Sequence, residues 1–141
     1  MNAVHQASAV EIDGRAVLIE GAPGSGKSSL ALALIDRGAR LIGDDAVMLE
    51  PAGGRLLVHP HPTVAGLIEV RNVGLVTMPV ASAVPVALVL VLDRDAPHHV
   101  ESADMTQRAG IDVPVLRLWP DSAVLALRAE IALARHGRIA P

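Results

Sequence analysis

Apolar residues gather in short runs along the first twenty positions of the chain. Residues 8–12 and 15–20 have the composition of two strands, and Asp13-Gly14 between them is a dipeptide typical of a tight hairpin turn. Residues 16–19 are apolar without interruption, which is the pattern of a strand buried on both faces of a sheet. The sequence therefore predicts a β-hairpin whose second strand lies inside a sheet.

A helix is expected over residues 27–37, because this stretch is rich in Ala and Leu. Gly38 follows it, at the position where a left-handed residue often caps a helix. Further strands are expected over 39–42, 46–50, 55–58, 86–92 and 115–118, and a closing helix over 121–136 with Asp121 or Ser122 as its N-cap. This order predicts the α/β class, with a mixed sheet, flanking helices and β-hairpins.

Two other segments are expected to be irregular. Pro60 and Pro62 lack backbone donors and restrict the residues before them, so no regular structure is expected over 59–62. Residues 93–112 are polar, and we expect a loop with one helical turn there.

The composition limits the size and the partners of the protein. The chain has 141 residues, which is about one domain. It carries 12 basic and 15 acidic residues, a formal net charge of −3, so neither nucleic acid nor an anionic membrane is an expected partner. No signal peptide is evident, and the longest apolar stretch, 84–92, is too short to cross a bilayer, so a cytoplasmic location is expected by default.

Residues 21–28 match the phosphate-binding loop signature G-x-x-x-x-G-K-[ST] at every fixed position. The candidate ligand-binding residues are Gly21, Ala22, Pro23, Gly24, Ser25, Gly26, Lys27, Ser28 and the following Ser29. The glycines let backbone amides curl around an anion, and the expected helix adds its positive dipole end. Lys27, the only lysine of the chain, can reach the β- and γ-phosphates, and the Ser28 hydroxyl can bind Mg²⁺. The sequence therefore predicts that the chain binds ATP and Mg²⁺.

Asp44 and Asp45 end the expected strand that follows this helix. Ligands of open α/β sheets bind beyond the carboxyl ends of strands, so the pair is expected near the phosphate loop. A carboxylate there can hold magnesium or accept a proton from an attacking hydroxyl. Adjacent residues of a strand face opposite ways, so we expect the two to differ in role. An ordinary solvated turn explains Gly-Asp-Asp equally well.

Glu69 and Arg71 alternate with apolar neighbours, and both are expected on one face of a strand. From the pattern alone, an exposed ion pair of little energetic value is the better interpretation. His59 and His61 lie beside prolines and could ligate a metal, but no third ligand is evident, so a zinc site is not expected.

The stretch from Gly21 to Val47 resembles the catalytic domain of the bacterial HPr kinase/phosphorylase family. That domain carries a phosphate loop, a helix, an R-G-x-R-L segment and then D-D-x-V, which residues 37–41 and 44–47 match here. Residues 67–75 are similar to a second family signature, L-x-E-I-R-G-x-G-I, and 110–114 resemble the family's C-terminal end. The family's usual N-terminal domain has no counterpart, so the resemblance implies a single, truncated catalytic domain over residues 1–141.

The resemblance implies an ATP-dependent protein serine kinase. Its expected substrate is HPr, a carrier of the sugar phosphotransferase system, or a related phosphocarrier. Full-length relatives assemble as hexamers through the catalytic domain, so a homo-oligomer is also implied.

The resemblance also implies roles for single residues. By motif match, Asp44, with Asp45 beside it, is the proton acceptor for the attacking serine, and Lys27 stabilises the transferred phosphoryl group. The implied magnesium ligands are Ser28 and Glu69. Two further candidate catalytic residues are Arg71, in the same signature as Glu69, and His5, which is similar to a family histidine ahead of the first strand.

Two departures from the family pattern change the expected activity. The arginine- and glycine-rich stretch that the family uses for phosphorolysis is replaced by residues 119–122, Trp-Pro-Asp-Ser, so we expect weak or absent phosphorylase activity. No clear match to the family's catalytic arginine follows the long apolar strand. The alternative functions are therefore a nucleotide-binding regulator without turnover, or a small-molecule kinase of the phosphate-loop type.

Overall fold

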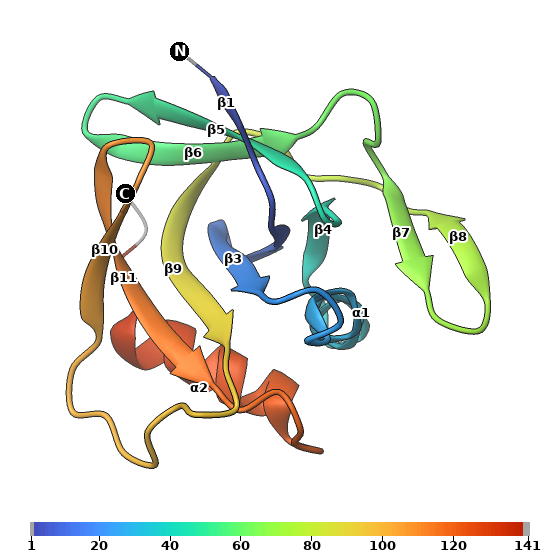
Figure 1. Ribbon diagram of the computed structural model, residues 1–141. Coiled ribbons are helices and arrows are strands. Elements are labelled where there is room, and N and C mark those ends of the chain that lie inside the picture. The colour runs from blue at the N-terminus through green and yellow to red at the C-terminus, as the bar shows by residue number, and fades with distance from the viewer. Residues whose placement is uncertain (1, 140–141) are drawn as a thin grey trace.

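The computed structural model describes residues 2–139, which form a curled mixed sheet, two helices and a projecting hairpin (Figure 1). The strands are β1 (Ala3–His5), β2 (Ser8–Ile12), β3 (Arg15–Gly21), β4 (Arg40–Gly43), β5 (Val47–Ala52), β6 (Arg55–Pro60), β7 (Leu67–Val70), β8 (Gly74–Thr77), β9 (Val84–Leu92), β10 (Asp104–Arg108) and β11 (Ile111–Leu118). The helices are α1 (Lys27–Asp36) and α2 (Leu125–His136). Within this described part, no helix is long and apolar enough to span a membrane.

The main sheet has nine strands, and β9 lies at its centre. Along most of its length β9 pairs with β3 in parallel; its first residues also pair with β6, and its last residues with β11. On the other side of β3, β2 pairs with β3 and β4 pairs with β2. Both pairings are antiparallel, so β4 runs parallel to β3. The carboxyl ends of β3, β4, β9 and β11 therefore meet at one edge of the sheet, where ligands of such sheets bind.

Two apolar clusters hold this sheet together, one on each face. Val17 and Ile19 of β3 face the cluster that α1 and α2 cover, whereas Ala16 and Leu18 face the cluster enclosed by the β5–β6 hairpin. All four side chains are fully buried. The continuous apolar run predicted a strand buried on both faces, and the structure confirms it.

The first hairpin and the first helix are also confirmed. β2 and β3 pair across Asp13-Gly14, whose φ values of 50° and 84° belong to the left-handed region that tight hairpin turns require. Helix α1 ends within a residue of its expected end, and Gly38 follows with φ of 111°. Local sequence was sufficient here because both features depend on a few adjacent residues.

The second half of the predicted loop over 93–112 is a hairpin, so that prediction was wrong. β10 pairs with β11 across Ala109-Gly110, which have φ values of 49° and 80°. β10 is polar because it lies at the edge of the sheet and its residues are mostly exposed, which removes the apolar pattern of a strand.

Two smaller predictions were also wrong. His59 and Pro60 belong to β6; Pro60 is its last residue, and β9 pairs only with Leu57 and Val58, so the missing N–H of proline interrupts no bond on that side. Helix α2 begins at Leu125, four residues later than expected, and its N-cap, Val124, makes no side-chain cap.

Candidate active site

The phosphate loop joins the carboxyl end of β3 to the start of α1, as its signature requires. Gly21 has φ of 153°, and a Cβ there would lie 2.6 Å from Ser25 Oγ and 3.2 Å from the Leu92 carbonyl oxygen, so only glycine fits. Gly26 has φ of 103° and directly precedes the helix. The turn is closed by a 3.0 Å hydrogen bond from the Ser25 amide to the Ala22 carbonyl.

Two polar side chains of the loop, Ser25 and Lys27, differ in their access to a ligand. The Ser25 hydroxyl is buried and has no hydrogen-bond partner among residues 2–139, which is costly for a polar group. Lys27 Nζ donates to the Gly21 carbonyl at 2.8 Å, so its ammonium lies against the loop itself. A phosphate chain in the loop would offer acceptors to the Lys27 ammonium and to the backbone amides, and the loop therefore fits a nucleotide.

Asp44 connects three elements at the other side of this loop. Its Oδ1 accepts hydrogen bonds from Ser28 Oγ at 2.6 Å and from Ser8 Oγ at 3.0 Å. Its Oδ2 accepts from the Glu69 amide at 3.1 Å. The carboxylate is thereby fixed beside the serine that the loop signature assigns to magnesium, and hydroxyl and carboxylate oxygens are the ligands that this ion prefers.

Asp45 lies beside it but is held less firmly. Strand β4 ends at Gly43, so neither aspartate is in the strand, and the argument that they face opposite ways because strand residues alternate was wrong. Asp45 has φ of 68° and is exposed, with only its amide bound to Ser8 Oγ at 3.4 Å. Both aspartates line the same cavity.

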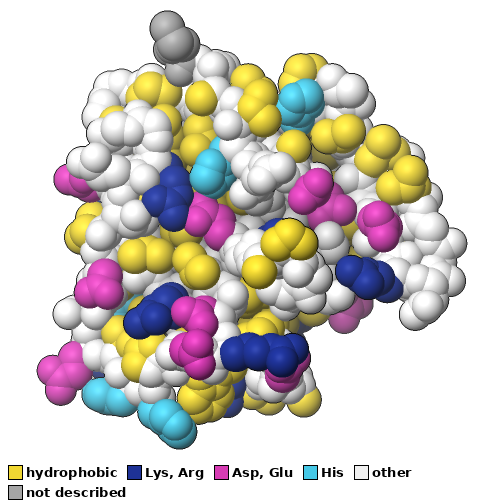
Figure 2. Space-filling model, viewed as in Figure 1, with side chains coloured by type: hydrophobic (Ala, Val, Ile, Leu, Met, Phe, Trp, Pro, Cys, Tyr) yellow, Lys and Arg dark blue, Asp and Glu magenta, His cyan; other side chains and the backbone are white. Residues whose placement is uncertain are grey.

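This cavity, the phosphate cavity, has a volume of about 460 Å³. Its lining consists of Pro23, Gly24, Gly26, Lys27, Ser28, Ser29, Asp44, Asp45, Glu69 and Arg71. Figure 2 shows acidic and basic side chains gathered on this face, where α1, β4 and the β7–β8 hairpin meet. Of the predicted site residues, Gly21, Ala22 and Ser25 belong to the loop but do not line the cavity, and His5 lies outside it.

Glu69 and Arg71 reach the cavity from the β7–β8 hairpin. Glu69 lies in β7, but the strand ends at Val70, so Arg71 belongs to the turn and not to the same strand face as expected. The ion pairs of the described residues do not include one between Glu69 and Arg71. The interpretation of the two as an exposed ion pair was therefore wrong, and both side chains are exposed to the cavity.

A second charged group lies at the end of β3, and it contains His5. His5 Nε2 lies 2.7 Å from Glu20 Oε2, and Arg108 binds both oxygens of Glu20, at 2.7 and 2.9 Å. Burial opposes ionisation of Glu20, but the hydrogen bonds from Arg108 and His5 outweigh it and lower the pKa of this carboxyl to about 2. The hydrogen bond to Glu20 raises the pKa of Arg108.

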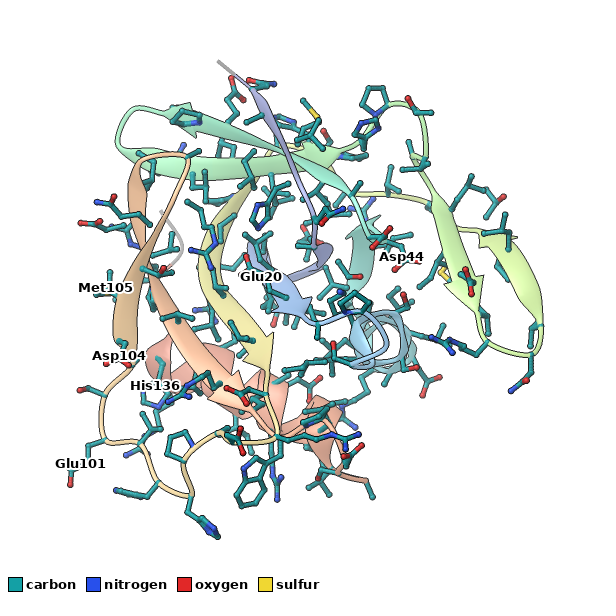
Figure 3. The ribbon with its side chains drawn as sticks, in the orientation of Figure 1. Glu20, Asp44, Glu101, Asp104, Met105 and His136 are labelled. Carbon is teal, nitrogen blue, oxygen red and sulfur yellow. The ribbon has the colours of Figure 1, made fainter. Side chains whose placement is uncertain are left out.

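Sequence reasoning missed Glu20 and Arg108. The signal for Glu20 was a single acidic residue directly before the loop, at the end of an apolar strand. Arg108 had no signal of its own, because the hairpin that brings it there was itself not predicted. Figure 3 shows Glu20 and Asp44 on different sides of the loop that joins β3 to α1.

Comparison with known proteins points to one family. A sequence model of the HPr serine kinase C-terminal domain matches residues 1–83. The chain is 37% identical over 116 residues to an HPr kinase/phosphorylase of Brevibacillus brevis, and 41% identical over 70 residues to one of Clostridium tetani. These alignments cover 77% and 50% of the chain but only 36% and 23% of the two relatives, so the chain spans a minor part of their length.

The fold has a similar counterpart among solved structures. The Hpr(Ser) kinase/phosphatase from Coxiella burnetii superimposes with a TM-score of 0.82, over 94% of both chains and with 26% sequence identity. The match includes the curled mixed sheet and both helices, which confirms the predicted α/β fold class. The chain belongs to the family of the HPr serine kinase C-terminal domain.

Proposed function

We propose that this chain is an ATP-dependent protein kinase that transfers the γ-phosphoryl group to a seryl hydroxyl of HPr or a related phosphocarrier. The observation that carries the proposal is the 2.6 Å contact between Ser28 and Asp44 inside the phosphate cavity. It joins the candidate magnesium ligand of the loop to a carboxylate, and the family membership supplies the reaction class.

Most of the cavity's side chains have a place in this reaction. Ser28 and Glu69 would hold magnesium, which neutralises charge on the phosphates when bound. Lys27 binds the β- and γ-phosphates as a point charge. Arg71 lies at the hairpin turn, where its guanidinium can bind an oxygen of the transferred phosphoryl group or of the protein substrate.

Asp44 is the proposed proton acceptor for the attacking serine, and Asp45 is the alternative candidate. The contact with Ser28 also favours Asp44 as a second carboxylate near the metal. Asp45 is exposed at the edge of the cavity, where a protein substrate would approach. The two aspartates therefore need to be separated by substitution.

We also propose that phosphorolysis is weak or absent. That reaction requires inorganic phosphate to be held beside a second phosphate, which needs additional positive charge. Lys27 and Arg71 are the only Lys or Arg side chains that line the cavity in the described part of the chain. Residues 119–123 add neither arginine nor glycine, none of them lines this cavity, and the Asp121 carboxylate is paired with Arg94 at 3.3 Å.

The central experiment is incubation with γ-labelled ATP, Mg²⁺ and purified HPr. We expect label on HPr that survives acid, as a seryl phosphate does, and none on an HPr variant whose acceptor serine is alanine. The reverse reaction is tested with phosphoserine-HPr, excess inorganic phosphate and detection of pyrophosphate. Tight binding of ATP without transfer to any HPr would instead support the nucleotide-binding regulator.

We also propose a cytoplasmic location and assembly as a homo-oligomer. A kinase of a phosphotransferase-system carrier would act in the cytoplasm, where ATP and that carrier are found. The family resemblance implies a homo-oligomer, up to a hexamer, and sedimentation of the purified chain measures this directly.

A further inference from the structure

A second hollow adjoins the phosphate cavity, and none of the chemistry proposed above uses it. It has a volume of about 220 Å³ and lies between the first turns of α1 and the segment that joins β11 to α2. Gly26 and Ser29 line both hollows, so the two meet at the start of α1. We call it the α1–α2 groove, and its other lining residues are Leu30, Ala33, Pro120, Ser122, Ala123, Leu125 and Ala126.

The two hollows differ sharply in chemistry. The α1–α2 groove contains no charged side chain, and its lining consists of small or apolar residues and two serine hydroxyls. The phosphate cavity carries Asp44, Asp45 and Glu69, none of which lines the groove. Carboxylates repel phosphates unless a cation lies between them, so the surroundings of these three side chains suit the metal and the terminal phosphate.

A nucleoside triphosphate has the same asymmetry as these joined hollows. Its terminal phosphates are highly charged and bind magnesium, whereas its base is flat and largely apolar on both faces. If the terminal phosphate lies beside the carboxylates, the chain of phosphates leads back along the loop to Ser29 and the nucleoside leaves at that end. We propose that the α1–α2 groove binds the base and ribose of the nucleotide whose phosphates lie in the loop.

The groove has the open space and the hydrogen-bonding group that a base and ribose require. Ala33 and Ala123 have small side chains, which leaves the space of the groove open between the two helices. Ser122 Oγ accepts a hydrogen bond from the Val124 amide at 3.2 Å, and its own proton is available to a ribose or base acceptor. The inference rests on the proposed function, because the groove can bind the base and ribose only if the loop holds the phosphates of the same nucleotide.

The test uses two ligands that share a phosphate chain and differ in the nucleoside. Mg-ATP and Mg-tripolyphosphate are titrated by calorimetry into the wild type, Ala33→Leu and Ala123→Leu. We expect each variant to weaken ATP binding by at least about tenfold, because the added side chain fills the groove, with tripolyphosphate affinity within about twofold. The matched control is Ala134→Leu, at an exposed position of α2 outside the groove, which should change neither affinity.

Every outcome of this experiment is informative. Unchanged ATP affinity in both groove variants, or equal losses for ATP and tripolyphosphate with an intact melting transition, would overturn the inference but leave the phosphate site in place. Wild-type protein that binds neither ligand would overturn the proposed function and the inference with it. The use of two variants on different segments guards against a local folding defect in either one.

Discussion

Two groups of charged side chains flank the phosphate loop, and they are built in opposite ways. On one side, Glu20 is paired with both Arg108 and His5, and the side chains of Glu20 and Arg108 are only 15% and 22% exposed. On the other side, Asp45 and Glu69 are exposed to a cavity, and in the described structure neither carboxylate has an ion-pair partner. The first group is closed and the second is open.

The difference shows that a perturbed pKa and a functional site need not coincide. The largest pKa change in the described part of the chain is that of Glu20, yet both its oxygens are already occupied. A carboxylate that is held by a bidentate arginine and a histidine, and that is largely buried, is poorly accessible to a substrate or a metal ion. We therefore interpret the closed group as a structural clamp between β3 and β10, and the open group as the reactive site.

The largest expected effect comes from the aspartates of the open group. Asp44→Asn should lower the rate of phosphoryl transfer by roughly 10²- to 10⁴-fold, because an amide cannot accept the proton of the attacking hydroxyl. Nucleotide affinity, measured by calorimetry, should change far less. Single-turnover transfer from labelled ATP to HPr gives the rate.

Asp45→Asn is the matched control, since it makes the same change in the adjacent residue. Its transfer rate should fall less than that of Asp44→Asn. A larger fall would assign proton transfer to Asp45, and Asp44, through its contact with Ser28, would then be a metal-binding residue.

The next effect concerns the loop. Lys27→Ala removes the only ammonium that can reach the β- and γ-phosphates, and charge-assisted hydrogen bonds of this kind correspond to roughly 10- to 100-fold in affinity. We expect that loss for Mg-ATP in a calorimetric titration, with an unchanged melting temperature. Equal affinities of the wild type and the variant would contradict the assignment of the loop.

A smaller effect is expected at the metal. Glu69→Gln should raise the magnesium concentration needed for half-maximal transfer by roughly tenfold, because one anionic oxygen ligand is replaced by a neutral one. Arg71→Gln is a suitable comparison, since Arg71 lines the same cavity and carries no metal-ligating oxygen. If both variants depend on magnesium as the wild type does, Glu69 is not near the ion.

How well the sequence predicted each contact of these two groups depends on how far apart in the sequence the contacting residues lie. The phosphate loop and the Asp44-Asp45 pair depend on adjacent residues, so their placement was predictable. The 3.0 Å contact of Ser8 with Asp44 and the clamp between Glu20 and Arg108 join residues 36 and 88 positions apart. Such contacts depend on the pairing of β2 with β4 and on the β10–β11 hairpin, which no local pattern specified.

His5 illustrates the same limit. The resemblance implied a catalytic role, but the side chain binds Glu20 in the closed group and does not line the phosphate cavity. We expect His5→Gln to change the transfer rate by less than about threefold, since glutamine can still donate a hydrogen bond to Glu20. A loss comparable to that of Asp44→Asn would show that the closed group takes part in the chemistry.

The smallest effect on transfer, and the clearest on stability, is expected for Glu20→Gln. The folded-state pKa of Glu20 is about 2, against an ordinary value of 4.5, so the charged form is favoured by folding. The stabilisation, roughly 3 kcal/mol, is fully present above about pH 5 and is lost as the pH falls toward 2. Urea unfolding at a series of pH values should therefore show a difference between wild type and variant that is largest at neutral pH and shrinks in acid.

Glu101→Gln supplies the matched control, because Glu101 is 91% exposed and its contact with His99 is 4.0 Å long. An exposed pair of this kind contributes little, so the control should follow the wild type at every pH. If the free-energy difference between wild type and Glu20→Gln were independent of pH, the loss would reflect packing and not the charge of Glu20. A pH-dependent difference with transfer close to the wild-type rate would instead support the closed group as a clamp, separate in function from the open site across the loop.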